Sequence, residues 1–366
     1  MNKELQSFPG ARRFEEFNDL AKRERLLPIK VPPFYAQKVR EEVMALGSDE
    51  GPLYRCVLPT DEHMGVHSAD EVADFVDDRR NMPECAEDTI IRKYEYRLLF
   101  TPTDSCAGHC RYCCRTDVLA DQHERFLPDI TEKIDTLMGF LADHPEIDEV
   151  ILSGGDPMLL PYNVLREILE KLKSEANIAN IRIHTRTLAF SPKVFDEKRC
   201  EALAQANVRV VHHIVHPYEI CDEVRSKIAM LHEHGVRSYN QFPMLKKVND
   251  HFLVLKRLLT ELDEIGVRNL SIFIPDPIKY SAGFRLSLKR LFSIMDELNR
   301  TTSAWVHSTR LALDSPFGKV QREDLLYMDE ERHVAVFDRD GREIEYPDLP
   351  QEMDEPGDPA VMLWKG

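Results

Sequence analysis

Residues 96–115 read YRLLFTPTDSCAGHCRYCCR, a short apolar run followed directly by a loop with four cysteines. Five further short apolar runs follow along the chain, at 149–155, 180–187, 208–217, 236–245 and 269–277. Each run precedes a window with helical periodicity, and strands that alternate with helices are typical of a parallel sheet. A spacing of about 30 residues per unit fits a βα barrel. Six units rather than eight predict an α/β fold with a partial (β/α)6 TIM-like barrel that is open on one side.

The pattern divides the chain into three parts. Residues 93–320 are predicted to form the barrel with the functional sites. Residues 1–92 show no βαβ rhythm and are interrupted by prolines, which predicts a mainly helical N-terminal cover. Residues 321–366 are predicted to form a C-terminal extension, in which HVAVFDRDGREIEYP (333–347) has a DG turn between alternating segments and predicts a β-hairpin.

Composition limits the partners. The 366 residues include 48 Lys and Arg against 64 Asp and Glu, a net charge of −16. Nucleic acid and anionic membrane surfaces both favour basic proteins, so neither is expected as a partner. No apolar stretch has the length of a signal-peptide core or a membrane span, and we expect a cytoplasmic protein that acts on a small molecule.

The cysteine spacing predicts an iron–sulfur site. Cys106, Cys110 and Cys113 form the pattern Cx3Cx2C. Three thiolates on one loop can hold three irons of a [4Fe–4S] cluster and leave the fourth iron open to a ligand. A structural zinc ion, with Cys114, His109 or a distant residue as fourth ligand, and three unrelated buried cysteines are the alternatives.

This spacing on the loop after the first strand resembles the radical S-adenosylmethionine (SAM) superfamily. The resemblance implies that the open iron binds the amino and carboxylate groups of SAM, and that one-electron reduction releases a 5'-deoxyadenosyl radical. The segment after the second strand is similar to the GGE-type segment of that superfamily, which implies SAM contacts for Ser153, Gly154, Gly155 and Asp156. His213 is also placed near SAM, with a hydrogen-bonded core histidine as the alternative.

Several separated segments are similar to the lysine 2,3-aminomutase family, which adds pyridoxal phosphate (PLP) to the radical chemistry. They include VLPT (57–60), LSGGD (152–156), HTR (184–186), HIVHP (213–217), NQ (240–241) and GFR (283–285). The resemblance implies that Lys319 is the catalytic Schiff-base lysine, on a loop that is shorter and poorer in glycine than that of the family. It also implies a set of residues around the PLP phosphate, namely Tyr94, Arg97, Arg186, Asn240 and Gln241.

The same resemblance implies the substrate contacts. Arg115 matches the arginine that binds the substrate α-carboxylate, and Asp276 and Asp314 match positions that face the side-chain ammonium of lysine. Two buried carboxylates are unfavourable without a cation, which agrees with a basic amino acid as substrate. The predicted activity is that of an isomerase, a 2,3-aminomutase that converts lysine or another basic amino acid to its β-amino acid.

Other functions remain open at this stage. The same cofactors could serve arginine, ornithine or a protein-bound lysine, or an elimination or oxidation. A non-catalytic iron–sulfur electron carrier is the alternative from another class. The resemblance implies an electron donor of the flavodoxin or ferredoxin type. Because no cysteine follows Cys221, we expect no structural zinc of the kind found in the tails of long family members, and a homo-oligomer stays open.

Overall fold

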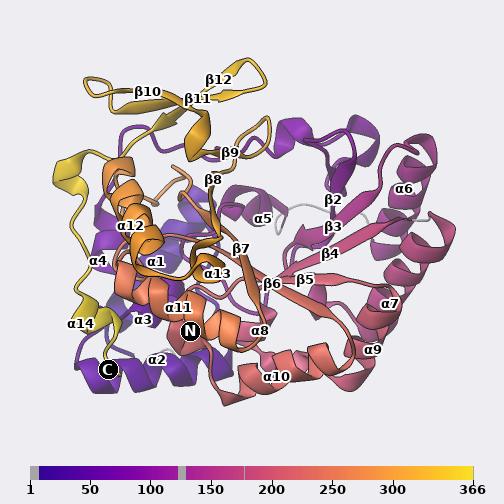
Figure 1. Cartoon of the computed structure of the whole chain (residues 1–366), viewed down its shortest axis with the longest axis horizontal. Helices are drawn as coiled ribbons and strands as arrows, with labels where there is room; N and C mark the ends of the chain where they lie inside the picture. Colours follow the sequence, from indigo (N-terminus) through magenta and orange to yellow (C-terminus); the bar gives the residue numbers. More distant parts are fainter. Residues whose placement is uncertain (1–7, 123–128, 177, 366) are drawn as a thin grey trace.

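The computed structural model describes residues 8–122, 129–176 and 178–365. Within these ranges the centre of the molecule is a nine-stranded sheet whose strands follow one another in sequence order (Figure 1). Its members are β1 Ile90–Ile91, β2 Arg97–Thr103, β3 Glu149–Gly154, β4 Asn180–Thr185, β5 Arg209–His212, β6 Arg237–Pro243, β7 Arg268–Phe273, β8 Arg310–Leu313 and β9 Val320–Gln321.

The sheet is mostly parallel. Strands β2 to β8 pair in parallel, and β1 and β9 add antiparallel at the two ends. All six strands predicted from the sequence are present, but the expected number of parallel strands is wrong by one. The seventh, β8, has four residues, RLAL, as β5 does, but unlike β5 it has no apolar run that continues past the strand.

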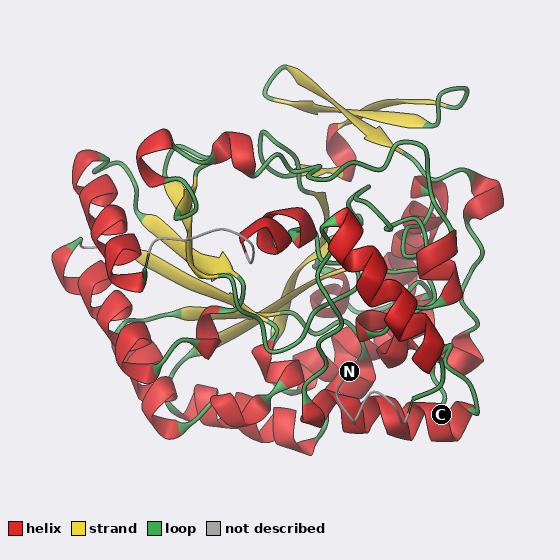
Figure 2. Cartoon of the chain, turned by 180° about the vertical axis from the view of Figure 1, so that it is seen from behind, coloured by secondary structure: helices red, strands yellow, loops and turns green. Residues whose placement is uncertain are grey.

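Helices connect the parallel strands and lie along the outer side of the sheet (Figures 1 and 2). The long ones are α6 Ile130–Asp143, α7 Tyr162–Glu170, α9 Glu197–Gln205, α10 Asp222–Glu233, α11 Phe252–Glu264 and α12 Leu288–Thr301. The start of α6 is fixed by a capping box, in which Asp129 accepts hydrogen bonds from the amides of Thr131 and Glu132. No helix within the described ranges is long and apolar enough to cross a membrane.

Alternation along the strands separates the core from the functional side. In β4, Ile181, Ile183 and Thr185 are buried, whereas Arg182 and His184 are half-buried. Successive side chains of a strand point to opposite faces. The apolar face therefore packs into the main hydrophobic core, and the polar face lines a cavity.

Further helices complete the chain. The N-terminal part contains the long helices α1 Ala11–Glu24 and α2 Pro33–Leu46. The short helices are α3 Pro52–Val57, α4 Asp61–Gly65, α5 Thr116–Gln122, α8 Thr187–Phe190, α13 Ala304–His307 and α14 Pro359–Met362. A separate antiparallel sheet beside β9 (Figure 1) consists of β10 Leu325–Asp329, β11 Val334–Arg339 and β12 Arg342–Pro347. The predicted hairpin at 333–347 is confirmed, because β11 pairs with β12 from Val334 opposite Pro347 to Arg339 opposite Arg342.

Candidate functional site

One cavity of about 350 Å³ collects nearly all of the predicted site residues. This volume lies within the range of small-molecule sites, about 300–1,000 Å³. The loops that follow the parallel strands supply much of its wall, as is usual for sites in parallel α/β folds. The predicted residues that line it are Tyr94, Arg97, Cys106, Cys110, Cys113, Arg115, Ser153, Gly154, Gly155, Asp156, Arg186, His213, Gln241, Asp276, Asp314 and Lys319.

Asn240 is the exception. Its side chain is fully buried on β6, donates to the carbonyl of Ile214 at 3.0 Å and to Oδ1 of Asn269 at 3.0 Å, and accepts from the Ile214 amide at 2.8 Å. Through these bonds the side-chain amide of Asn240 links β6 to the segment after β5 and to β7. The structure therefore does not bring Asn240 to the cavity, because its neighbour Gln241 is the one that points there.

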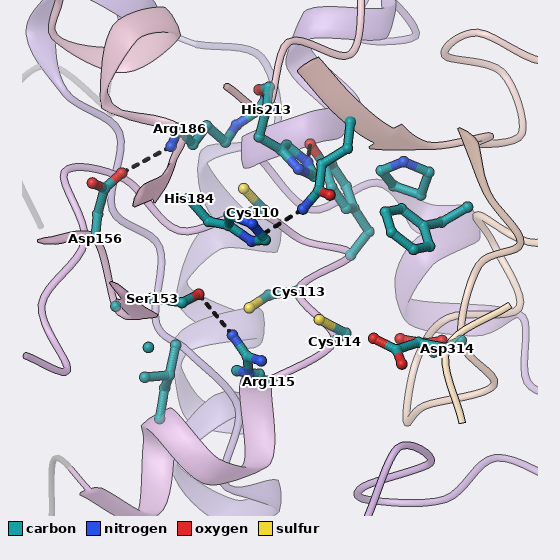
Figure 3. A pocket seen from close by; sticks show the side chains of 18 of the residues that line it. Cys110, Cys113, Cys114, Arg115, Ser153, Asp156, His184, Arg186, His213 and Asp314 are labelled. Carbon is teal, nitrogen blue, oxygen red and sulfur yellow. Dashed lines mark hydrogen bonds between the residues drawn. The ribbon is translucent and has the colours of Figure 1, made fainter. Parts of the chain in front are cut away.

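The cysteine loop follows β2 and is held from outside by the chain after α1. The amide of His109 donates to the carbonyl of Lys30 at 2.9 Å, and Arg111 donates to the carbonyl of Leu27 at 3.0 Å. In Figure 3 the sulfurs of Cys110 and Cys113 lie in the pocket, with Arg115 on one side and His184 on the other.

The three thiols are near enough to raise one another's pKa values. Burial, followed by the neighbouring Cys110, raises the pKa of Cys113 to about 11, and burial with the other two thiols also raises the pKa of Cys106. A metal ion deprotonates a coordinating thiol. In the described part of the chain, no three His, Cys, Asp or Glu side chains form a tight ligand set for a single metal ion.

The segment after β3 packs directly on the cysteine loop. The amide of Gly155 donates to the carbonyl of Thr103, and that of Asp156 to the carbonyl of Ser105, both at 2.8 Å. A Cβ atom on Gly155 would lie 2.5 Å from backbone atoms of Asp104 and Ser105, so only glycine fits at this position.

The side chain of Asp156 forms its hydrogen bonds with other residues of the protein. Its buried carboxylate accepts hydrogen bonds from the Thr185 hydroxyl at 2.7 Å and from the amides of Arg186 and Thr187 at 2.8 and 2.9 Å. These bonds tie the end of β3 to the end of β4. Asp156 is therefore placed to position its neighbours, with its oxygens already engaged by protein donors.

Arg186 and His213 lie on the cysteine side of the cavity. Arg186 donates to Oε1 of the fully buried Glu219 and to the carbonyl of His213, at 2.8 and 2.9 Å. Burial opposes the charge of Arg186, but Glu219, then Tyr112 and Cys110, raise its pKa. Burial and the Arg186 charge hold the pKa of His213 well below its usual range, so this ring is neutral.

Lys319 follows a loop that is fitted to Tyr94. The Lys319 amide donates to the Tyr94 hydroxyl at 2.9 Å. Gly318 has a φ of 107°, and a Cβ atom there would lie 2.9 Å from the Tyr94 ring, so the loop retains a glycine where the structure requires it. Burial lowers the pKa of the Lys319 amine, with a partial offset from Asp314, and a neutral amine is the nucleophilic form.

Two guanidinium groups lie next to Lys319. Arg182 Nε is 2.9 Å from Glu149, Arg97 Nη1 is 3.7 Å from the same carboxylate, and Arg97 covers the Tyr94 ring at 4.0 Å. The positive charges of both arginines help to lower the pKa of the Lys319 amine, after burial. Arg182 was missed by the sequence analysis, although its place two residues before His184 on the same strand face could have indicated it.

Two predicted carboxylates lie close together in the same cavity, and Asp314 is also near Lys319. Burial, then Asp314, raises the pKa of Asp276 to about 8, and Asp78 and Asp74 act in the same direction. An acid with such a pKa is mostly protonated at pH 7 unless a cation stabilises its charge. The structure thus brings the two predicted aspartates together and provides a place for a positive charge.

Asp78 and Lys93 hold Arg115 in place, and the sequence offered no motif for either. Arg115 Nε donates to Asp78 at 2.8 Å and Nη1 donates to the Ser153 hydroxyl at 2.9 Å. Lys93 lies 3.0 Å from the other oxygen of Asp78, whose side chain is buried. These bonds orient the guanidinium beside the cysteine loop.

A model of the radical SAM superfamily matches residues 100–259, which include β2 to β6 and the cysteine loop. A putative L-lysine 2,3-aminomutase of Aquifex aeolicus is 27% identical over 278 residues, which cover 74% of this chain and 72% of that protein. This chain contains a radical SAM domain and is related to the L-lysine 2,3-aminomutases. The enzymes of that name from Fusobacterium nucleatum and Escherichia coli are each 28% identical, over 83% and 77% of this chain and 69% and 79% of their own lengths.

A solved radical SAM methyltransferase from Sphaerobacter thermophilus has a TM-score of 0.44 at 15% identity, over 63% of this chain and 72% of that chain. A radical SAM domain implies a [4Fe–4S] cluster and SAM. The three thiols on one loop, beside a glycine segment without side chains, fit these two groups.

Proposed function

We propose that this radical SAM enzyme is a PLP-dependent 2,3-aminomutase that converts an L-α-amino acid with a basic side chain, most simply lysine, to the β-amino acid. The observation that carries the proposal is the composition of one cavity. It combines the cysteine triad, a half-buried lysine near two arginines, and a pair of aspartates. An electron-transfer protein needs the first of these features and not the other two.

The residues around Lys319 fit PLP. Arg97 and Arg182 together carry two positive charges against the single charge of Glu149, which leaves a positive excess for a phosphate dianion. When bound, PLP supplies a conjugated ring that stabilises an unpaired electron while the amino group moves between adjacent carbons. Lys319, whose amine is shifted toward its neutral form, supplies the nitrogen that attaches the cofactor.

The remaining residues hold the substrate. Arg115, fixed by Asp78 and Ser153, binds the α-carboxylate and keeps the reacting carbons near the cysteine loop. Asp276 and Asp314 bind the side-chain cation, which supplies the charge that lets Asp276 ionise.

The fold supports the same proposal. Strands β2 to β8 run in parallel in sequence order with helices on the outer side, as a partial barrel requires. The predicted division into an N-terminal cover, a barrel and a C-terminal extension, and an electron donor of the flavodoxin or ferredoxin type, are parts of the proposal.

The test is an anaerobic assay of the enzyme reconstituted with iron, sulfide, PLP and SAM, with a chemical reductant. Lysine, arginine, ornithine and L-norleucine are supplied in parallel, and products are separated by chromatography with mass detection. We expect a β-amino acid from a basic substrate, with SAM consumed in catalytic amounts, and none from norleucine. Lys319→Ala should retain the iron content and lose the product.

Two results would contradict the proposal. Formation of 5'-deoxyadenosine without a β-amino acid from any basic substrate would retain the radical chemistry and refute the aminomutase. Equal product from Lys319→Ala and the unmodified enzyme would refute the role of PLP at this lysine.

A further inference from the structure

His184 lies between the two functional ends of the cavity and has no part in the function described so far. It is on the cavity face of β4, two residues after Arg182, a step of about 6.6 Å along a strand. The basic groups nearest to it in charge effect are Arg182 of the same strand, Lys319, and Arg115 from the cysteine loop. The residue is thus placed where Lys319, its flanking arginines and the cysteine end all come within electrostatic range.

The hydrogen position on the His184 ring is fixed by Gln241. Nε2 of Gln241 donates to Nδ1 of His184 at 3.2 Å, so Nδ1 is an acceptor and the neutral ring carries its hydrogen on Nε2. Burial, followed by the charges of Arg182 and Lys319, holds the pKa of His184 well below its usual range. The ring is therefore a neutral donor at physiological pH.

That donor is unused. His184 Nε2 is shielded from solvent and has no hydrogen-bond partner among the described residues. A buried donor without a partner is unfavourable, and in native structures such groups usually indicate a missing water, ion or ligand. Arg182, on the same strand face, already has an anionic partner, because its guanidinium pairs with Glu149.

The charged groups around His184 favour one kind of acceptor for its Nε2–H group. Arg182 and Arg115 create a positive potential at His184, which favours an anionic oxygen over a neutral or cationic group. PLP carries its phenolate oxygen on the carbon next to the one that bears its aldehyde. A lysine that binds the aldehyde therefore brings this oxygen close to itself.

We propose that His184 contacts the cofactor, and that its Nε2–H donates a hydrogen bond to the phenolate oxygen of PLP held at Lys319. This inference rests on the proposed function. The bond stabilises the phenolate over the phenol and orients the ring between the arginines and the cysteine loop. Gln241 acts through His184 and is a positioning residue.

The experiment follows the cofactor itself and needs no turnover. The enzyme with its cluster is loaded with PLP anaerobically, and the visible absorbance of bound PLP is titrated with pH without reductant or substrate. His184→Phe keeps the ring and removes the donor, whereas His184→Gln retains an amide N–H. We expect the apparent pKa of the chromophore to rise by about one unit in His184→Phe, a tenfold change in the dissociation constant, and less in His184→Gln.

Two further variants complete the design. Gln241→Leu frees Nδ1 and lets the hydrogen move to it, so we expect a shift in the same direction as that of His184→Phe. Lys319→Ala tests the proposed function separately, because it should lose the chromophore altogether. Iron content and thermal unfolding, measured for each variant, identify any that fails to fold, and His184→Gln then carries the test.

The results separate the two proposals. If the enzyme shows no chromophore that depends on Lys319, the proposed function fails. If the chromophore is present and its pKa is the same in the enzyme, His184→Phe and His184→Gln, the inference about His184 is overturned and the proposed function stands. An unchanged chromophore pKa with weaker lysine binding would assign the donor to the substrate and also overturn it.

Discussion

The pH dependence of substrate binding follows from Asp276. Its pKa of about 8 arises first from burial and then from the charge of Asp314. A cationic side chain binds the ionised form, so at pH 7 binding must first release a proton from Asp276. Ionisation at pH 7 then costs about 1.4 kcal/mol, and about one tenth of the molecules are ionised before binding.

A higher pH should strengthen lysine binding, and loss of the Asp276 charge should weaken it. Between pH 7 and 8.5 the ionised fraction rises from about one tenth to about three quarters, so lysine affinity should increase about eightfold. Asp276→Asn removes the charge and should weaken lysine binding by roughly 2–5 kcal/mol, about 30-fold to several thousand-fold, and abolish this pH dependence. L-norleucine has the same carbon chain without the terminal ammonium group and should show neither effect.

Isothermal titration calorimetry on the cofactor-loaded, unreduced enzyme measures the affinity without turnover. Titrations in buffers of different ionisation enthalpy also count the protons released. Lysine should release about 0.9 more protons than norleucine at pH 7 and about 0.2 more at pH 8.5. Equal proton release by lysine and norleucine at pH 7 would refute the argument.

Three further outcomes are expected. Asp78→Asn removes the negative charge and one of the two acceptor oxygens that Arg115 and Lys93 share, and should raise KM for the amino acid about tenfold with a smaller change in kcat, as steady-state kinetics can show; an unchanged KM would contradict this role. Gly318→Ala places a methyl group against the Tyr94 ring, at a residue with a φ of 107°, and should therefore lower the affinity of the enzyme for PLP. The absorbance of bound PLP measures this affinity, and equal affinity in the variant and the unmodified enzyme would contradict the tight fit. Cys114→Ala should retain the iron and sulfide content of the enzyme, and loss of iron in elemental analysis would make Cys114 a ligand.

Much of the architecture could be predicted because it depends on local patterns. Alternating apolar runs and helical windows indicated six of the parallel strands, and the DG turn indicated the β11–β12 hairpin. β8 escaped although it is no shorter than β5, because the apolar run of β5 continues past the strand to Val215, whereas β8 is followed directly by Asp314. Its parallel pairing with β7 is a contact that only the folded chain shows.

The sequence by itself determined the chemical inventory of the site: three cysteines on one loop, a glycine segment, and a lysine after a short loop. The tertiary structure decided which neighbours each of these has. It placed Arg186 beside Cys110, turned Asn240 into the core, and brought Arg182 to Lys319. Motif spacing is a property of the chain within one loop, whereas burial, ion pairing and pKa values depend on residues that are distant in sequence and meet only after folding.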